Sequence, residues 1–169
     1  MRSLALALVI VAFSAPAYAR TGDTSGWIAS EAKRLDADVL KAKTAAGTHP
    51  SLKPPTLDAR LTPDLERFGL EASRLSVEID KAAGAVDLRC IFRGVAEETD
   101  AQLKALGAAR TGLDQSAALS RLDHMLKDAA QIAPVAGRLL AGDKSVAIPI
   151  DAPMGSYVKK CAAPTAKLR

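Results

Sequence analysis

Residues 60–87 read RLTPDLE RFGLEAS RLSVEID KAAGAVD, four consecutive groups of seven that carry the most regular pattern in the chain. The first position of each group is basic, the second and sixth are apolar, and the fifth is acidic in three of the four groups. Apolar residues at this spacing line one side of an α-helix, with ion pairs between the flanking charges. We therefore expect a helix that starts at Thr62-Pro63-Asp64, which supplies an N-cap, a first-turn proline and an acid near the positive end of the helix dipole.

The pattern breaks after Gly84. The next group of seven, LRCIFRG at residues 88–94, has arginines where the apolar side should continue. We therefore expect Gly84 to end this helix and Asp87 to cap the next one. One uninterrupted helix over residues 63–106 is the alternative.

Two further segments have helical periodicity, residues 25–46 and residues from about 114 to 133. Pro134 is expected to stop or kink the second of them, and residues 135–140 to add another turn or two. Residues 47–60 contain three prolines, which favour an extended connector over a helix.

The expected links at residues 84–86 and 107–113 are short, with Gly107 and Gly112 closing the third helix. Because short links join antiparallel neighbours, the sequence predicts an all-α, up-and-down bundle of about four helices in a single domain over residues 20–169. The apolar positions expected to face the core include Ile28, Ala32, Leu35, Val39, Ala42, Leu88, Ile91, Phe92, Val95, Leu103, Leu106, Leu119, Leu122, Leu126, Ala129 and Ala133.

The first 19 residues are typical of a cleaved export signal. Arg2 precedes an apolar run at residues 4–13, and Ala17-Tyr18-Ala19 provides small residues at the cleavage positions. A membrane anchor, the alternative, needs about 20 apolar residues, whereas this run is much shorter. We expect cleavage at Ala19/Arg20, a periplasmic or secreted protein, and no integral membrane span after cleavage.

Cys90 and Cys161 are the two cysteines of the chain. In an oxidising compartment an even number favours a disulfide bond, here one that closes a loop of about 70 residues. Free or intermolecular thiols are the alternative. Helical periodicity ends at Gly142, so we expect an irregular tail over residues 142–169 that the Cys90–Cys161 bridge pins to the third helix.

Composition and missing motifs exclude several classes of function. The chain has 23 basic and 19 acidic residues, a formal charge of +4, and only 4% aromatic residues. Its charges are interspersed, unlike the one-sided basic surface of a nucleic-acid binder. His49 has no second ligand at metal-binding spacing, and His124, about 200° around the helix from Leu122, is expected to be a solvated histidine near Asp128. No nucleophile elbow or phosphate-binding loop is present. We expect no metal, cofactor or nucleic acid, and assign no catalytic residue.

Arg89 and Arg93 are the one pair that keeps a ligand site under consideration. They stand one helical turn apart beside Cys90 and could bind a carboxylate or phosphate. The alternative is a solvated charged face in which Arg93 pairs with Glu97.

The leading functional hypothesis is a non-enzymatic bundle that binds another protein of the cell envelope. A small anionic ligand-binding protein, or a minor enzyme using an inter-helix groove, is the alternative, and a homodimer is compatible with either. The tail is the expected partner surface, unless it packs across the open end of the bundle. Its apolar residues are Ile148, Ile150, Met154 and Tyr157.

Overall fold

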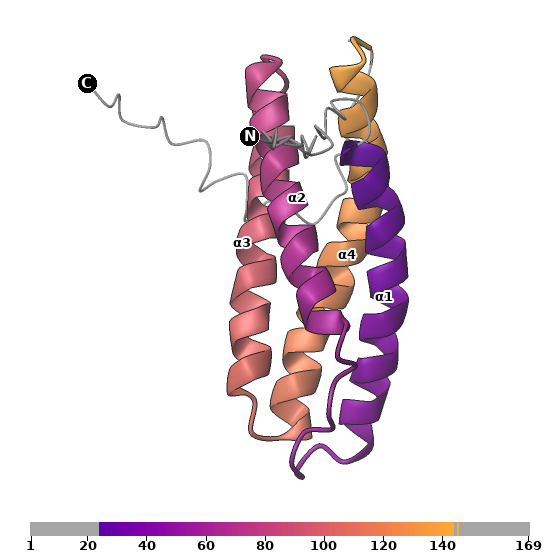
Figure 1. Cartoon of the computed structure of the whole chain (residues 1–169), viewed down its shortest axis with the longest axis vertical. Coiled ribbons are helices and arrows are strands. Elements are labelled where there is room, and N and C mark those ends of the chain that lie inside the picture. The colour runs from indigo at the N-terminus through magenta and orange to yellow at the C-terminus, as the bar shows by residue number, and fades with distance from the viewer. Residues whose placement is uncertain (1–23, 144, 146–169) are drawn as a thin grey trace, which may run out of the picture.

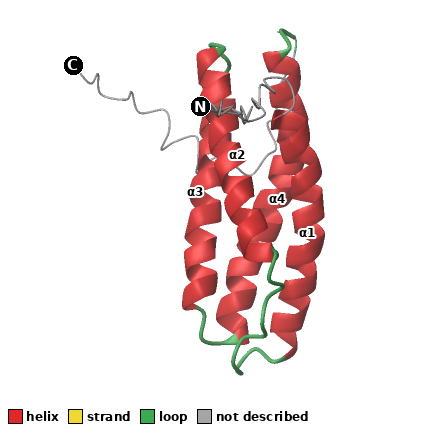
Figure 2. Cartoon of the chain, viewed as in Figure 1, coloured by secondary structure: helices red, strands yellow, loops and turns green. Residues whose placement is uncertain are grey.

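The computed structural model describes residues 24–143 and 145, and within them the chain forms four α-helices and no β-strand (Figure 1, Figure 2). The helices are α1 (Thr24–Thr48), α2 (Leu61–Lys81), α3 (Val86–Ala108) and α4 (Gly112–Leu140). In Figure 1, α1 and α3 run in one direction and α2 and α4 in the other. The predicted all-α bundle is therefore confirmed. The expected leader, most of the tail and Cys161 lie outside the described residues.

Neighbours in the bundle follow the order of the chain, and α1 also lies beside α4. The most extensive packing joins α1 to α4 and α2 to α3, while α3–α4 and α1–α2 contacts complete the ring. Most of the predicted core positions are fully buried, and Ala42, Leu103 and Leu106 pack partly buried against the same core. None of the described helices combines the length and apolar character needed to cross a membrane.

The proline-rich connector takes part in the fold. It rises from the lower end of α1 to the start of α2, which lies well above the lower ends of the other helices (Figure 2). Its carbonyl groups accept hydrogen bonds from the start of α4: the amide of Gly112 donates to Leu52 (2.9 Å) and that of Leu113 to Pro50 (2.8 Å). The first amides of a helix have no partner within it, so the connector supplies what α4 lacks.

Gly112 begins α4 and does not close α3, contrary to the sequence prediction. Thr111 is the N-cap: its hydroxyl accepts a hydrogen bond from the amide of Asp114 (3.2 Å), whose carboxylate accepts one from the amide of Thr111 (3.0 Å). This reciprocal capping box starts the helix two residues before the predicted range. A Cβ atom on Gly112 would lie 2.5 Å from the carbonyl oxygen of Ala46, so only glycine fits here.

The chain between α2 and α3 turns sharply, which confirms two helices over residues 63–106. The amide of Ala83 donates to Asp80 (3.1 Å) and that of Gly84 to Ile79 (2.9 Å), the hydrogen bonds of a Schellman motif. Ala83, with a φ of 50°, occupies the left-handed position at the end of α2, where the sequence predicts Gly84. A Cβ atom added at Gly84 would lie 2.8 Å from Leu139 Cδ2, 2.9 Å from Ile79 Cγ2 and 3.0 Å from the carbonyl oxygen of Ile79, so a larger residue would force its neighbours to shift.

Two predicted N-caps are wrong. α2 begins at Leu61 with Arg60 as its N-cap, and α3 begins at Val86 with Ala85 as its N-cap, so Thr62 and Asp87 lie inside the first turns. Neither N-cap makes a side-chain capping hydrogen bond. The Schellman turn already delivers Ala85 in the extended conformation that an N-cap requires.

Pro134 does not end α4, which continues to Leu140. Proline removes one amide donor from the helix, while Ala133 and Ala136 on either side of it remain fully buried. Packing against the other helices therefore outweighs the lost hydrogen bond. α4 ends at a second Schellman motif in which Gly142, with a φ of 92°, takes the left-handed position.

Candidate functional site

Arg89 and Arg93 lie on α3 as predicted, and each is paired with an acid. Arg89 Nη1 donates to Asp80 Oδ1 of α2 (2.5 Å), and Arg93 Nε donates to Glu97 Oε1 (2.9 Å). The Arg93–Glu97 pair is the one expected for a solvated charged face. An incoming anion would have to compete with both carboxylates, so the anion-binding hypothesis gains no support from this geometry.

The predicted disulfide and tail surface remain predictions. Cys90 is 1% exposed in the core-facing side of α3, while Cys161 lies outside the described residues. The same holds for the expected partner surface, which consists of Ile148, Ile150, Met154 and Tyr157.

The two histidines lie on the surface of the bundle. His49 and His124 are both exposed, His124 on α4 and His49 just after α1. Burial raises the pKa of Asp128, one turn beyond His124, and the charge of His124 opposes that change. Across residues 24–143 the structure brings together no group of three histidine, cysteine or acidic side chains able to hold a metal ion.

A charged cluster lies at the junction of α1 and α4. Asp123 of α4 is only 4% exposed and accepts a hydrogen bond from Lys43 Nζ of α1 at 3.0 Å. Lys127, one turn along α4, binds the other carboxylate oxygen of Asp123. Burial acts to raise the pKa of Asp123, but the hydrogen bonds from Lys127 and Lys43 hold it well below its usual range.

Asp36 of α1 completes this cluster. It is half-buried, and its Oδ1 atom is shielded from solvent without a hydrogen-bond partner. Burial, followed by the side-chain interaction with Asp123, raises the pKa of Asp36 against the opposing charges of Lys127 and Lys43. Two acids in contact therefore have pKa values shifted in opposite directions.

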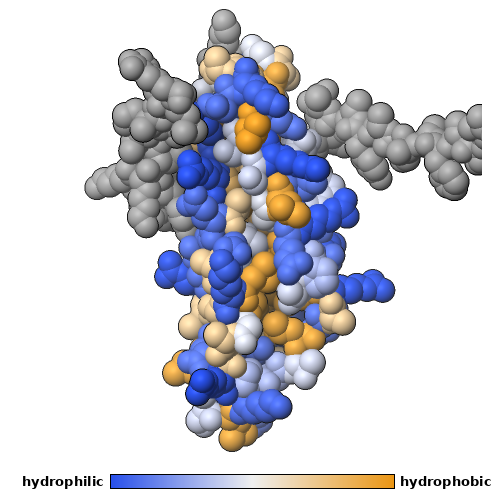
Figure 3. All heavy atoms as spheres, turned by 60° about the vertical axis from the view of Figure 1, so that its left-hand side comes forward, coloured by the Kyte–Doolittle hydropathy of each residue, from blue (hydrophilic) through white to orange (hydrophobic). Residues whose placement is uncertain are grey.

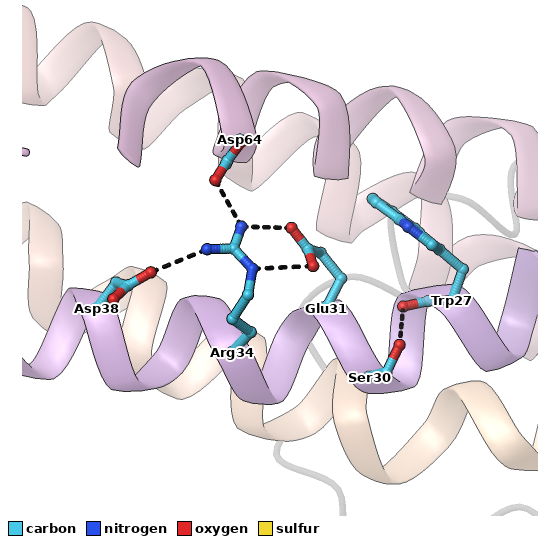
Figure 4. Close-up of polar contacts among 6 residues, drawn as sticks. All are labelled: Trp27, Ser30, Glu31, Arg34, Asp38 and Asp64. Atoms are coloured by element: carbon cyan, nitrogen blue, oxygen red, sulfur yellow. Dashed lines mark hydrogen bonds and ion pairs between the residues drawn. The ribbon is translucent and has the colours of Figure 1, made fainter. Parts of the chain in front are cut away.

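A second charged network joins α1 to α2 around Arg34 (Figure 4). Its guanidinium group donates to Glu31 and Asp38 of α1 and to Asp64 of α2, at distances between 2.5 and 3.0 Å. The hydrogen bond to Glu31 is the largest of the contributions that raise the pKa of Arg34. Because the Arg34 side chain is 45% exposed, water screens this network.

Further polar contacts follow the same α1–α2 boundary towards the N-terminus of α1. The guanidinium of Arg67 lies 5.1 Å from the centre of the Trp27 ring, within the range of a cation–π contact. Thr24 Oγ1 donates to Glu78 Oε1 at 3.2 Å. The boundary between α1 and α2 is therefore lined by polar contacts along its outer edge.

The outward side of α2 carries apolar residues. Leu70 is 68% exposed and Val77, two turns later, is 49% exposed. Arg74 is exposed beside both, four residues after Leu70 and three before Val77. Figure 3, in which the α3 side of the molecule is turned forward, shows apolar groups along the long axis between hydrophilic side chains.

Sequence reasoning missed the acids at the α1–α4 junction because they occur singly. Asp36 directly follows the core residue Leu35, and Asp123 directly follows the core residue Leu122. A residue next to a core position lies about 100° around the helix, at the edge of the buried side. The four-residue spacing of Asp123 and Lys127 is the signal that could have drawn attention to this edge.

No family model, no curated protein and no solved structure matches this chain. Its function must therefore be inferred from its own residues.

Proposed function

We propose that this protein is an exported, non-enzymatic helical bundle that acts by binding another protein of the cell envelope. The observation that carries the proposal is the pair of exposed apolar side chains Leu70 and Val77 on α2. Leu70 is the most exposed of the large apolar side chains among the described residues. The bundle gains nothing from it in the folded monomer, since its apolar surface stays in water.

The spacing of these residues defines the chemistry of the partner. Seven residues are two helical turns, so Leu70 and Val77 form one row along α2. Arg67, Arg74 and Lys81 form an adjacent exposed row at the same spacing. A complementary partner is an amphipathic helix with apolar residues along one side and acidic residues beside them.

The charged groups of the described residues support binding better than catalysis. The ion pairs around Arg34, Arg89 and Asp123 join neighbouring helices, and Arg93 pairs with Glu97 along α3. Their geometry accounts for these side chains without a substrate. A partner-binding role needs only a surface, which α2 provides.

The test is co-purification of partners with the full-length protein expressed in its own cells. The double variant Leu70→Ser, Val77→Ser is compared with Leu40→Ser, which alters a leucine on α1 that is 48% exposed, about as much as Val77. We expect a protein that co-purifies with the parent and with the Leu40→Ser variant to be lost from the double variant. Retention of every co-purifying protein by the correctly folded double variant would contradict the proposal.

Export and the disulfide belong to the same proposal. Cleavage at Ala19/Arg20 would place the chain in an oxidising compartment, where Cys90 and Cys161 would form a bond. The intact mass of the protein from its own cells tests both: we expect a chain starting at Arg20 that is two hydrogens lighter than its reduced form. A chain that starts at Met1 would contradict the expected cleavage. A mass equal to that of the chain with both thiols reduced would contradict the disulfide bond.

A further inference from the structure

α1 and α4 share the most extensive packing of any two helices in the described bundle. A pair of acids lies at their junction. Asp123 is 4% exposed, and the Oδ1 atom of Asp36 is buried without a hydrogen-bond partner. Two carboxylates in contact repel each other when both are ionised, and burial increases that repulsion. If one of them holds a proton, the repulsion is replaced by a hydrogen bond from the acid to the carboxylate.

The lysines determine which acid keeps its charge. Lys43 and Lys127 direct their ammonium groups to separate oxygens of Asp123. The charges that act most strongly on Asp36 come from Lys43 of α1 itself and from Asp123 and Lys127 of α4. Asp123 is therefore stabilised as a carboxylate, and Asp36 is the member of the pair suited to carry the proton.

We propose that Asp36 and Asp123 share one proton across the α1–α4 junction, and that this pair makes the bundle less stable as the medium becomes less acidic. The proposal is independent of any partner bound by α2. It gives the fold a built-in response to acidification of its surroundings, located at the boundary of its two longest helices.

The direction of the response follows from the two titrations. Asp36 has a raised pKa in the folded state, so the stability it contributes is complete below the ordinary value of 3.8 and is lost as the pH rises through the folded value. Asp123 has a lowered pKa, so its contribution is present above 3.8 and is lost as the pH falls through the folded value. The combined contribution is largest between the two folded values.

The test compares urea unfolding of the full chain and two variants from about pH 4 to about pH 8. Asp36→Asn replaces the acid with a neutral amide that can still donate a hydrogen bond to Asp123. Asp100→Asn is the control, because Asp100 is an exposed acid on α3 that pairs only along its own helix with Lys104.

We expect the parent protein to lose stability relative to Asp36→Asn as the pH rises, so that the variant is the more stable protein near pH 8. Each unit by which the pKa of Asp36 is raised corresponds to a tenfold difference in the folding equilibrium constant above that pKa. Asp100→Asn should follow the parent throughout. An Asp36→Asn variant whose stability changes with pH in parallel with the parent would overturn the proposal.

Asp123→Asn tests which of the two acids carries the proton. We expect this variant to be less stable than the parent at every pH in the range, because it leaves Lys43 and Lys127 without their carboxylate. If Asp123→Asn instead became the more stable protein near pH 8, the proton would reside on Asp123 and the assignment would be wrong.

Discussion

α1 takes part in two networks of oppositely charged side chains, one directed to α2 and one to α4. In the first, Arg34 binds acids of both helices while its side chain remains 45% exposed. In the second, Asp123 binds two lysines and is 4% exposed. The ion pairs of the two networks do not contribute equally, because water competes for the exposed Arg34 guanidinium, whereas the Asp123 carboxylate is shielded from water.

The two networks also differ in how easily water can replace their contacts. The Arg34 network links α1 to α2 by side chains at the rim, where each contact can be replaced by water. The Asp123 cluster lies where α1 and α4 pack most extensively, so every charge that loses its partner there must be resolvated or neutralised. We therefore expect the α1–α4 junction to respond more strongly to substitution and to pH.

The largest effect is expected from Asp123→Ala, which removes the carboxylate that Lys43 and Lys127 bind. We expect a loss of about 2–3 kcal/mol in the free energy of unfolding, less than for a fully buried pair because both lysines reach solvent. Urea unfolding at neutral pH measures it.

Asp38→Ala is the matched control for that loss. Asp38 lies on α1, binds Arg34 at 3.0 Å and is 50% exposed. We expect it to cost less than about 1 kcal/mol. Equal losses for the two variants would remove the distinction between the networks.

Ala83→Gly provides a reference effect that involves no charge. Ala83 has a φ of 50° at the end of α2, whereas Gly142 occupies the equivalent position at the end of α4. Relief of the left-handed strain should raise the free energy of unfolding by about 1 kcal/mol, since glycine adopts this conformation readily.

Gly142→Ala should have the opposite effect on thermal unfolding, lowering stability by a similar amount. A stabilising Gly142→Ala variant would show that the end of α4 is not held in this conformation. The pair of variants thereby calibrates how small a change the unfolding measurements resolve.

The smallest effect is expected for the Arg34–Asp64 pair between α1 and α2. A double-mutant cycle with Arg34→Ala and Asp64→Ala should give a coupling of about 0.2–1 kcal/mol. The coupling should decrease in about 1 M salt, where charges are screened within about 3 Å. A coupling that is unchanged in high salt would mean that this contact is shielded from solvent like the Asp123 cluster.

Much of the fold could be predicted because the helical pattern repeats along the chain. The buried positions of α1, α3 and α4 recur every three or four residues, and the break after Gly84 marks a real change of helix. The effect of Pro134 could be predicted only as a stop or a kink, because a sequence shows the lost hydrogen bond but not the packing that lets α4 continue to Leu140. Gly112 was wrongly predicted to close α3, because the contact that requires glycine at this position is with Ala46, far away in the chain.

The acids at the α1–α4 junction could not be predicted in the same way. Asp36 and Asp123 are separated by most of the described chain, and each alone resembles a surface residue beside a core position. Only the pairing of α1 with α4 brings them together, and sequence periodicity does not specify which helices become neighbours. The exposure of Leu70 and Val77 could not be predicted either, since an apolar row on a helix can lie outside the core.

The most direct test of the account is a ¹³C NMR titration of the side-chain carboxyl groups of Asp36 and Asp123 in the folded protein. We predict that the two groups titrate apart, with the pKa of Asp36 above the ordinary value of 3.8 and that of Asp123 below it. Two carboxyl groups that titrate together near 3.8 would contradict the shared proton and the special role of the α1–α4 junction.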